Sequence, residues 1–317
     1  MSESIHKAAA VLRGGGLVAL PTETVYGLGA DAMNAQAVAR VFALKGRPIT
    51  HPLIVHIANV QGMEQWAADI PKSAWQLAEA FWPGPLTLIL KRKPHVLDAV
   101  TGGQDSVGLR VPAHPLALAL LAEFSGGIAA PSANRYGRVS ATTAEHVREE
   151  FGAAVDCILD GGPCHVGIES TIVSCMGDDP VLLRPGVITP SALAEVLGRP
   201  VLMPDGQQVV PRAPGSDAAH YAPALPARCV NTNLIETALH AVGTTALLHY
   251  NELAPAVAEQ VIARRMPAQA DAYAQQLYAA LRWADTTGAA QLLIELPPVG
   301  EAWLAVHDRL ARATQSG

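Results

Sequence analysis

Short apolar runs alternate with amphipathic stretches along the first 200 residues. The runs are rich in Val, Ile and Leu and bounded by Gly, Pro and polar residues, a pattern typical of buried strands. They predict strands at residues 17–20, 53–57, 86–90, 107–111, 128–130, 155–159, 171–175 and 181–183. This alternation indicates an α/β layer structure rather than a helix bundle or a β-sandwich.

Helix signals lie between several of these runs. Asn34 stands where the N-cap of a helix is expected, and Thr142 or Thr143 precedes an amphipathic stretch that reaches residue 151. Pro115 and Pro190 stand where two further helices are expected to begin. The predicted helices cover residues 35–44, 115–124, 143–151 and 190–197. Direct passages from strand to strand within residues 86–111 and 155–183 indicate hairpins, so we expect a mixed sheet.

The pattern changes after residue 200. Residues 201–226 are rich in Pro, Gly, Asp and Gln without a sustained period, which indicates an interdomain linker. A second α/β unit is predicted at residues 227–317, with strands at 228–230, 246–249 and 292–296 and helices at 234–242, 270–284 and 301–313. We therefore expect a catalytic domain at residues 1–200, a linker at 201–226 and a smaller C-terminal domain.

Composition narrows the class of protein. Half of the 317 residues are hydrophobic and the net charge is −6, which argues against broad electrostatic binding of nucleic acid. The apolar runs are too short to span a membrane and the N-terminus lacks the regions of a signal peptide, so we expect a cytoplasmic location. The four cysteines show no metal-ligand spacing, which favours reduced thiols and no protein-bound metal.

Polar loops gather at the predicted strand ends. The first, Pro-Thr-Glu-Thr-Val-Tyr-Gly-Leu-Gly-Ala-Asp at residues 21–31, sets two threonine hydroxyls and two glycines after an apolar strand, which suits a small polar ligand. Any one such loop can simply turn the chain. Together, these loops offer Thr24, Lys45, Arg47, His56, Ser106, Arg110, Ser132, Asn134, Ser140, Ser170 and Arg184. Cations and hydroxyls in this proportion suit a nucleoside triphosphate beside a second ligand that carries a carboxylate.

Several of these residues also have a structural interpretation. Arg110 interrupts an apolar strand and needs a buried partner, either Glu169 or the carboxylate of a ligand. Lys45 and Arg47 end a helix, where they can complement the helix dipole or clamp phosphates. His56 is either a core histidine or part of the site. The chain has no P-loop, GxGxxG, GxSxG or HExxH motif, so a nucleotide would bind through another scaffold.

Eight motifs in a fixed order resemble a known family. PTETVYGLGADA, KGRP, HPLIVHI, FWPGPLTLIL, VGLRVP, APSAN, ESTIV and LLRPG resemble the YrdC/TsaC-like threonylcarbamoyl-AMP synthases over about residues 5–200. The linker and the trailing unit resemble the long, two-domain form. The resemblance implies an α/β fold: an N-terminal YrdC-like mixed twisted sheet with flanking helices, and a smaller Rossmann-like C-terminal domain.

The resemblance also implies a reaction and its partners. L-threonine, bicarbonate and ATP would give threonylcarbamoyl-AMP, pyrophosphate and water in a nucleotidyltransferase reaction. Mg²⁺ would arrive with the phosphates rather than in a protein cage. The product would pass to a separate tRNA threonylcarbamoyl transferase, with direct RNA contact as a further expectation and no membrane partner.

Site roles follow from the same resemblance. Lys45 and Arg47 would be catalytic. L-threonine would contact Thr24, His56, Arg110, Ala130 and Ser170, with Arg110 on its carboxylate. ATP would contact Arg47, His51, Ser106, Ser132, Asn134, Ser140, Arg184 and Tyr221. His51 stands where the family commonly has Asn, and the linker, a candidate active-site lid, has fewer basic residues than is usual before Tyr221.

Two other functions are compatible with parts of the pattern. A carbamoyl-transfer module of hydrogenase-maturation proteins shares the fold and adenylate chemistry, but its acylphosphatase-like segment and Cys-rich zinc motifs are missing here. A double-stranded RNA binding module would use a basic face, which the acidic net charge and the five lysines disfavour.

Overall fold

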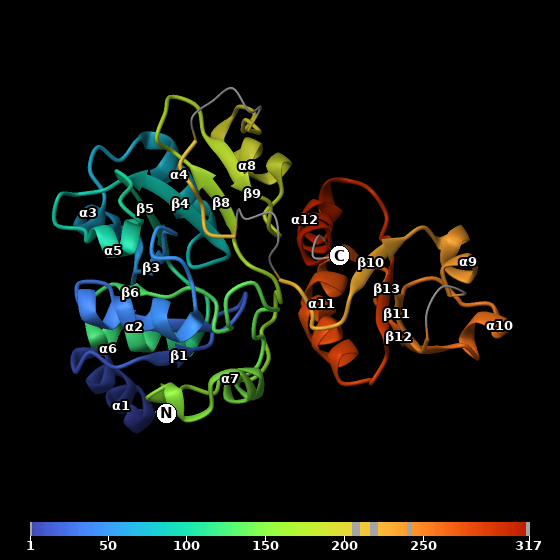
Figure 1. Ribbon diagram of the computed structural model, residues 1–317. Helices are drawn as coiled ribbons and strands as arrows, with labels where there is room; N and C mark the ends of the chain where they lie inside the picture. The colour runs from blue at the N-terminus through green and yellow to red at the C-terminus, as the bar shows by residue number, and fades with distance from the viewer. Residues whose placement is uncertain (1, 205–209, 216–220, 240–242, 315–317) are drawn as a thin grey trace. The chain divides into compact units, whose positions relative to one another are not determined.

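The chain forms two compact units (Figure 1). The computed structural model describes residues 2–204, 210–215, 221–239 and 243–314. The first unit holds Met1–Tyr136, Ala141–His165 and Glu169–Ser216, and the second holds Gly137–Ser140, Val166–Ile168 and Asp217–Gly317. Two short segments from the first 200 residues thus belong to the second unit. The chain leaves the first unit within the predicted linker rather than at residue 200.

A mixed sheet is the centre of the first unit, as predicted. Within the described residues it has nine strands in the order β7-β1-β2-β6-β3-β5-β4-β8-β9. The pairs β1–β7, β3–β5 and β4–β8 are parallel and the other neighbours are antiparallel. The strands are β1 Val18–Leu20, β2 Gly27–Asp31, β3 Ile54–His56, β4 Leu86–Lys91, β5 Ser106–Arg110, β6 Ile128–Ala129, β7 Cys157–Ile158, β8 Thr171–Ser174 and β9 Val181–Arg184.

Two helices of the first unit begin at N-caps that the sequence indicates, and α8 begins at the expected Pro190 with a further cap, Thr189. The Asn34 side chain accepts from two backbone N–H groups of α2, Thr143 caps α7, and Thr189 caps α8, so one donor or more at each N-terminus is satisfied. The helices are α1 Ser2–Arg13, α2 Ala35–Lys45, α3 Met63–Trp66, α4 Lys72–Phe81, α5 Asp98–Thr101, α6 Pro115–Phe124, α7 Ala144–Phe151 and α8 Pro190–Leu197, with short 3₁₀ turns at Val60–Gly62 and Gly152–Ala154. No described helix is long and apolar enough to cross a membrane.

The strands of the first sheet present different kinds of side chain on its two faces. Successive side chains of a strand point to opposite faces. Val55, Leu88, Leu109 and Val173 lie on one face and form a buried apolar cluster with residues of α4 and α8. Their neighbours in the same strands point the other way and include polar and charged side chains. This face therefore supplies the largest apolar cluster, whereas the opposite face carries a second apolar cluster around Ile128 beneath α1 and α6 and polar side chains farther along the sheet.

Residues 27–31 form a strand, which corrects their assignment to a ligand loop. β2 pairs antiparallel with both β1 and β6. A Cβ on Gly29 would lie 2.8 Å from side-chain atoms of Ile128 and Leu20 and 3.1 Å from the Val18 carbonyl oxygen, so glycine allows the strands to pack this closely. The glycines of this motif therefore serve sheet packing, and the loop proper is limited to the residues before them.

The two predicted hairpin regions behave differently. β4 and β5 do pair antiparallel, and so do β8 and β9. The hairpin expected within residues 155–183 is therefore β8–β9, whereas β7 is not part of it and pairs with β1. β7 and β8 lie at well-separated positions of the sheet. The segment between them crosses the sheet and brings Glu169 and Ser170 to the beginning of β4.

The second unit is a smaller α/β domain, as predicted. Its described residues form a four-stranded parallel sheet in the order β10-β13-β11-β12. Figure 1 shows α11 and α12 on one face of this sheet and α9 and α10 on the other. The strands are β10 Ala227–Val230, β11 Thr245–His249, β12 Val261–Arg265 and β13 Gln291–Glu295. The helices are α9 Ile235–Leu239, α10 Pro255–Ala258, α11 Ala270–Asp285 and α12 Leu304–Ala313, with 3₁₀ turns at Thr232–Leu234 and Glu301–Trp303.

The apolar face of the first sheet should dominate the stability of its unit. Leu88 is fully buried in β4 within the cluster, so we expect Leu88→Ala to lower the free energy of unfolding by about 2–5 kcal/mol through lost burial and a residual cavity. Ile49→Ala, at a side chain that is 73% exposed, is the matched control and should change it by less than about 0.5 kcal/mol. Denaturant unfolding followed by circular dichroism measures both. Equal effects of the two changes would contradict this view of the core.

Candidate functional site

Strand register places the predicted polar residues on one face. His56 in β3 lies directly beside Arg110 in the parallel strand β5, so both side chains point to the same side of the sheet. Ser106 stands four residues before Arg110 and shares that side. Ala130 donates its N–H to the Ile54 carbonyl at 3.0 Å and continues this face beyond β6. The sheet therefore brings four predicted site residues together on the face opposite the apolar cluster.

Arg110 is fixed by three contacts. Its Nε donates to the Gly84 carbonyl at 3.1 Å, and its Nη1 donates to the Thr24 hydroxyl at 2.9 Å. Its Nη2 lies 2.6 Å from a carboxylate oxygen of Glu23, in an ion pair that is not aligned as a hydrogen bond. The prediction that Glu169 is the protein partner of Arg110 is therefore wrong: the partner is Glu23, which lies in the same motif as Thr24.

The turn before β2 holds these partners in place. The Thr22 hydroxyl donates to the Val25 carbonyl at 2.6 Å and lies 2.8 Å from the Thr24 hydroxyl. The second carboxylate oxygen of Glu23 accepts from the backbone N–H of Ala113 at 2.9 Å. Thr24 and Glu23 are thus positioned by backbone contacts on both sides, which leaves the guanidinium of Arg110 little freedom.

His56 is buried and neutral. Burial, and then the charge of Arg110, lower its pKa from the ordinary value of 6.5 to about 3. Its Nδ1 has no hydrogen-bond partner among the described residues. A neutral imidazole beside a guanidinium offers a ring nitrogen as an acceptor without adding positive charge.

A second set of contacts surrounds Ser170. Its hydroxyl lies 2.8 Å from the Thr87 hydroxyl and accepts from Nη2 of Arg184 at 3.1 Å. Nε of Arg184 donates to the Ser170 carbonyl at 3.0 Å, and its Nη1 donates to the Pro214 carbonyl at 2.8 Å. Arg184 therefore ties the segment before β8 to the linker.

The linker residues 210–215 lie against the polar face of the first sheet. Ala213 is buried against Ile89 and Ile172, which point to that face. The Arg212 N–H donates to the side-chain oxygen of Gln104 at 2.7 Å. These contacts cover part of the face, as a lid would, although closure itself stays a prediction. Residues 216–220, on which the comparison of linker charge partly rests, lie outside the described residues.

Lys45 acts on the neighbouring loop. Its Nζ donates to the Ser132 carbonyl at 2.6 Å and to the Asn134 carbonyl. Burial and the nearby Arg47 charge hold the pKa of Lys45 well below its usual value. The Nη2 of Arg47 donates to the Pro52 carbonyl at 3.1 Å. Lys45 thus joins the end of α2 to the Ser132–Asn134 loop, so its direct contacts are with the backbone.

The other predicted nucleotide contacts lie in different surroundings. His51 is half-buried, with its ring 5.6 Å from that of Tyr136 in an edge contact. Ser140 and Tyr221 belong to the second unit. Tyr221 is buried there, stacked on Tyr278 at 5.6 Å, with the Arg309 guanidinium 5.4 Å from its ring. Their contact with ATP, like the other ligand roles, stays a prediction.

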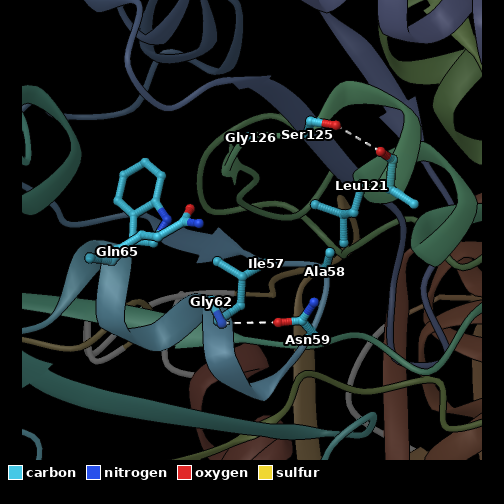
Figure 2. A pocket seen from close by; sticks show the side chains of 10 residues that line it. Ile57, Ala58, Asn59, Gly62, Gln65, Leu121, Ser125 and Gly126 are labelled. Carbon is cyan, nitrogen blue, oxygen red and sulfur yellow. Dashed lines mark hydrogen bonds between the residues drawn. The ribbon is translucent and has the colours of Figure 1, made fainter.

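The pocket in Figure 2 is separate from these residues. It is a cavity of about 330 Å³ between the segment after β3 and the end of α6. Its lining includes Ile57, Asn59, Gln65 and Leu121, and none of the predicted site residues. The Asn59 side chain accepts from the Gly62 N–H at 3.0 Å and so serves the local turn. This pocket does not identify the site.

Two residues that contact predicted site residues, Glu23 and Thr87, were not among the predictions from the sequence. The sequence could have indicated Glu23, because its carboxylate lies between the hydroxyls of Thr22 and Thr24 in the motif at residues 21–31. It could not have indicated Thr87, because Thr87 lies within an apolar run and its role depends on pairing with Ser170 across the sheet. No group of three or more His, Cys, Asp or Glu residues in the described ranges is arranged to hold a metal ion.

Removal of Glu23 should leave Arg110 buried without its counter-charge. We expect Glu23→Ala to lower the free energy of unfolding by about 3–5 kcal/mol, because an uncompensated buried charge remains. Glu64→Ala, at an exposed acid in the same unit, is the control. Thermal and denaturant unfolding test this expectation. An unchanged midpoint for Glu23→Ala would contradict the assigned pairing.

His56 should make the protein sensitive to acid. Its folded pKa of about 3 lies below the unfolded value of 6.5, so the unfolded state binds the proton first. The stabilisation is complete above pH 6.5 and is lost as the pH falls towards 3, at about 2 kcal/mol between pH 7 and pH 5. We expect His56→Gln to flatten the dependence of unfolding free energy on pH in this window. The exposed His6→Gln change serves as control, and identical slopes in both variants would contradict the burial effect.

Two family models match the chain. One for the Sua5, YciO and YrdC proteins, described as "Telomere recombination", matches residues 10–186. The other, described as "Threonylcarbamoyl-AMP synthase, C-terminal domain", matches residues 188–315. Together they extend over both units.

Similar proteins agree with these matches. A threonylcarbamoyl-AMP synthase of Bacillus subtilis is 42% identical over 320 residues, covering 98% of this chain and 92% of the relative. One of Pyrococcus abyssi is 47% identical over 222 residues, covering 69% and 65%. A crystal structure of Pyrococcus abyssi Sua5 complexed with L-threonine matches with a TM-score of 0.89 at 38% identity, covering 98% and 94% of the two chains. The chain therefore belongs to the Sua5/YciO/YrdC family, in the form that carries the Sua5 C-terminal domain.

Proposed function

We propose that this enzyme forms threonylcarbamoyl-AMP, pyrophosphate and water from L-threonine, bicarbonate and ATP. The observation that carries the proposal is Arg110, a buried guanidinium fixed beside Thr24 and His56 on the polar face of the sheet. A guanidinium in this position suits the carboxylate of an amino acid. Relatives named threonylcarbamoyl-AMP synthase and the L-threonine complex of the Pyrococcus abyssi protein support the choice of substrate.

The chemistry needs positioning more than a protein nucleophile. The threonine amine condenses with bicarbonate, which releases water and gives a carbamate. A carbamate oxygen then attacks the α-phosphorus of ATP, and pyrophosphate leaves with the electron pair of the broken P–O bond. Fixed cations and hydroxyls contribute by aligning the two reactants and stabilising the developing charge.

The residues divide into two groups in this proposal. Arg110 binds the threonine carboxylate, while Thr24, His56, the Ala130 backbone and Ser170 surround the rest of the amino acid. Neutral His56 can accept a hydrogen bond there without repelling a protonated amine. The nucleotide is assigned to Arg47, Ser106, Ser132, Asn134 and Arg184, with Lys45 holding the Ser132–Asn134 loop from behind.

Three further elements of the proposal concern class and partners. Transfer of the adenylyl group makes the enzyme a nucleotidyltransferase. Mg²⁺ enters bound to the phosphates of ATP, whose negative charge it partly neutralises. The product passes to a separate tRNA threonylcarbamoyl transferase, because a mixed anhydride of this kind is a reactive donor.

A reconstituted reaction tests the proposal. The purified chain is incubated with ATP, Mg²⁺, bicarbonate and L-threonine, and pyrophosphate release is measured together with the mass of the adenylate. We expect both products with L-threonine and neither without bicarbonate or amino acid. Pyrophosphate release without the threonylcarbamoyl adenylate, or tight RNA binding with no turnover, would overturn the proposal.

Arg110 and Arg184 should each contribute to the binding of a different substrate. We expect Arg110→Ala to raise the KM for L-threonine about 30- to 150-fold, equivalent to about 2–3 kcal/mol for a charged hydrogen-bonded pair, with a smaller effect on ATP. Arg184→Ala should affect ATP more than L-threonine. Exposed Arg13→Ala is the control. Initial rates over a grid of both substrates provide the comparison, and equal effects of both changes on both KM values would refute this division of roles.

A further inference from the structure

The second unit has the topology of a ligand-binding α/β sheet. The carboxyl ends of its parallel strands all lie along the same side of the sheet, which we call the carboxyl edge. The chain leaves β10 and β11 towards α9 and α10, but leaves β13, which lies between them, towards α12 on the opposite face (Figure 1). Loops that diverge to opposite faces open a crevice at the carboxyl ends of the strands, where ligands of such sheets commonly bind.

A cavity of about 420 Å³ lies at this carboxyl edge of the sheet. Its lining comes from the segments after all three of these strands and from α12. The residues are Asn231, Thr232, Asn233, Tyr250, Leu296, Pro297, Val299 and His307. This volume is within the range of about 300–1,000 Å³ that is usual for small-molecule sites.

A buried carboxylate organises the cavity wall. Glu295, the last residue of β13, is fully buried and accepts from the Thr232 hydroxyl at 2.7 Å and from the Tyr250 N–H at 2.8 Å. The backbone and side-chain N–H groups of Asn251 donate to it at 3.1 and 2.7 Å. Burial raises the pKa of Glu295, but these hydrogen bonds lower it more, so that the pKa lies below its usual value. The charge therefore fixes the tips of two loops relative to β13.

A second observation concerns Tyr273 of α11. Its hydroxyl is buried and has no hydrogen-bond partner in the part of the chain that the structure describes. Burial, followed by Cys229, Glu295 and Tyr250, raises its pKa above the usual value. The structure therefore leaves a buried polar atom of this unit unsatisfied within the described residues.

The chemistry of the lining excludes some ligand classes. None of the described residues around the cavity is a lysine or an arginine, so the site is not built to neutralise a phosphate. The two Asn side chains each offer a donor and an acceptor, and Asn231 makes no capping hydrogen bond to the turn that follows it. Tyr250 and Val299, whose side chain is 89% exposed, supply apolar surface for a flat ring.

We infer that this crevice binds an uncharged purine base. A purine ring can stack on an aromatic side chain, while its edge exchanges hydrogen bonds with amide groups such as those of Asn231 and Asn233. The same base chemistry is present in a free nucleoside and in an unstacked base of single-stranded RNA. The site is independent of the synthase reaction, which uses residues of the first sheet.

Equilibrium binding to the full chain tests the inference. Adenosine is titrated calorimetrically in the presence of a saturating non-hydrolysable ATP analogue, so that a nucleotide site in the first unit is already filled. We expect one adenosine equivalent to bind under these conditions. Asn231→Leu and Tyr250→Ala should each raise its Kd about tenfold or more, as loss of an edge contact or of a stacking surface does. Leu234→Ala, next to the lining but outside it and 48% exposed, is the control.

The outcomes are distinct. Binding that survives the ATP analogue and is weakened by both variants, but not by Leu234→Ala, supports the site. Use of two variants, one at an exposed side chain, keeps the test valid where one of them fails to fold. Competition by a short oligo(A) then identifies an RNA base as the source, and its failure to compete identifies the free nucleoside. The inference is overturned if no adenosine binds in the presence of the saturating ATP analogue. It is also overturned if wild type and both variants bind adenosine with equal affinity.

Discussion

The ion pair between Arg110 and Glu23 is the contact on which the candidate site depends. A charge buried in a sheet is strongly destabilising unless it is paired and hydrogen-bonded. Arg110 meets this requirement through Glu23, Thr24 and the Gly84 carbonyl, which come from two segments far apart in the sequence. Neither segment can shift without exposing an unsatisfied charge. The same contacts that make the arginine tolerable therefore fix its position before a ligand arrives.

The other buried cations follow the same principle. Lys45 and Arg184 direct their N–H groups to backbone carbonyls of a neighbouring loop and of the linker. Each of these side chains thus orders a segment that carries further predicted site residues. An enzyme that aligns two substrates and stabilises phosphate charge benefits from such preorganisation, because its groups need not reorganise as the reaction proceeds.

In the second unit, the buried charged group is a carboxylate rather than a cation. Glu295 is buried, and its hydrogen-bond partners within the described parts of the chain are all uncharged donors. Its position at the end of the central strand β13 means that the loops after β10 and β11 both converge on it. A parallel sheet with helices on both faces concentrates polar loop atoms at this edge, whereas its faces are covered by apolar contacts. Chemistry in this unit is therefore expected at the carboxyl ends of its strands, whereas in the first unit it is proposed on a face of the sheet.

The sequence by itself determined the layer class, the mixed sheet, most long elements and the family. Those features depend on local signals: apolar runs, the N-cap Asn34, the helix-opening Pro190, and motifs with a fixed order. It did not reveal α1, α4, α10 or β12, because their apolar residues are interrupted or short, and it assigned β2 to a loop because glycine has low strand propensity. Only the tertiary structure decided that Gly29 permits close strand packing, that Glu23 rather than Glu169 pairs with Arg110, and that Thr87 contacts Ser170. These facts depend on strand register and on which distant segments meet, and local sequence does not encode either one because a shift of one residue moves every side chain to the other face.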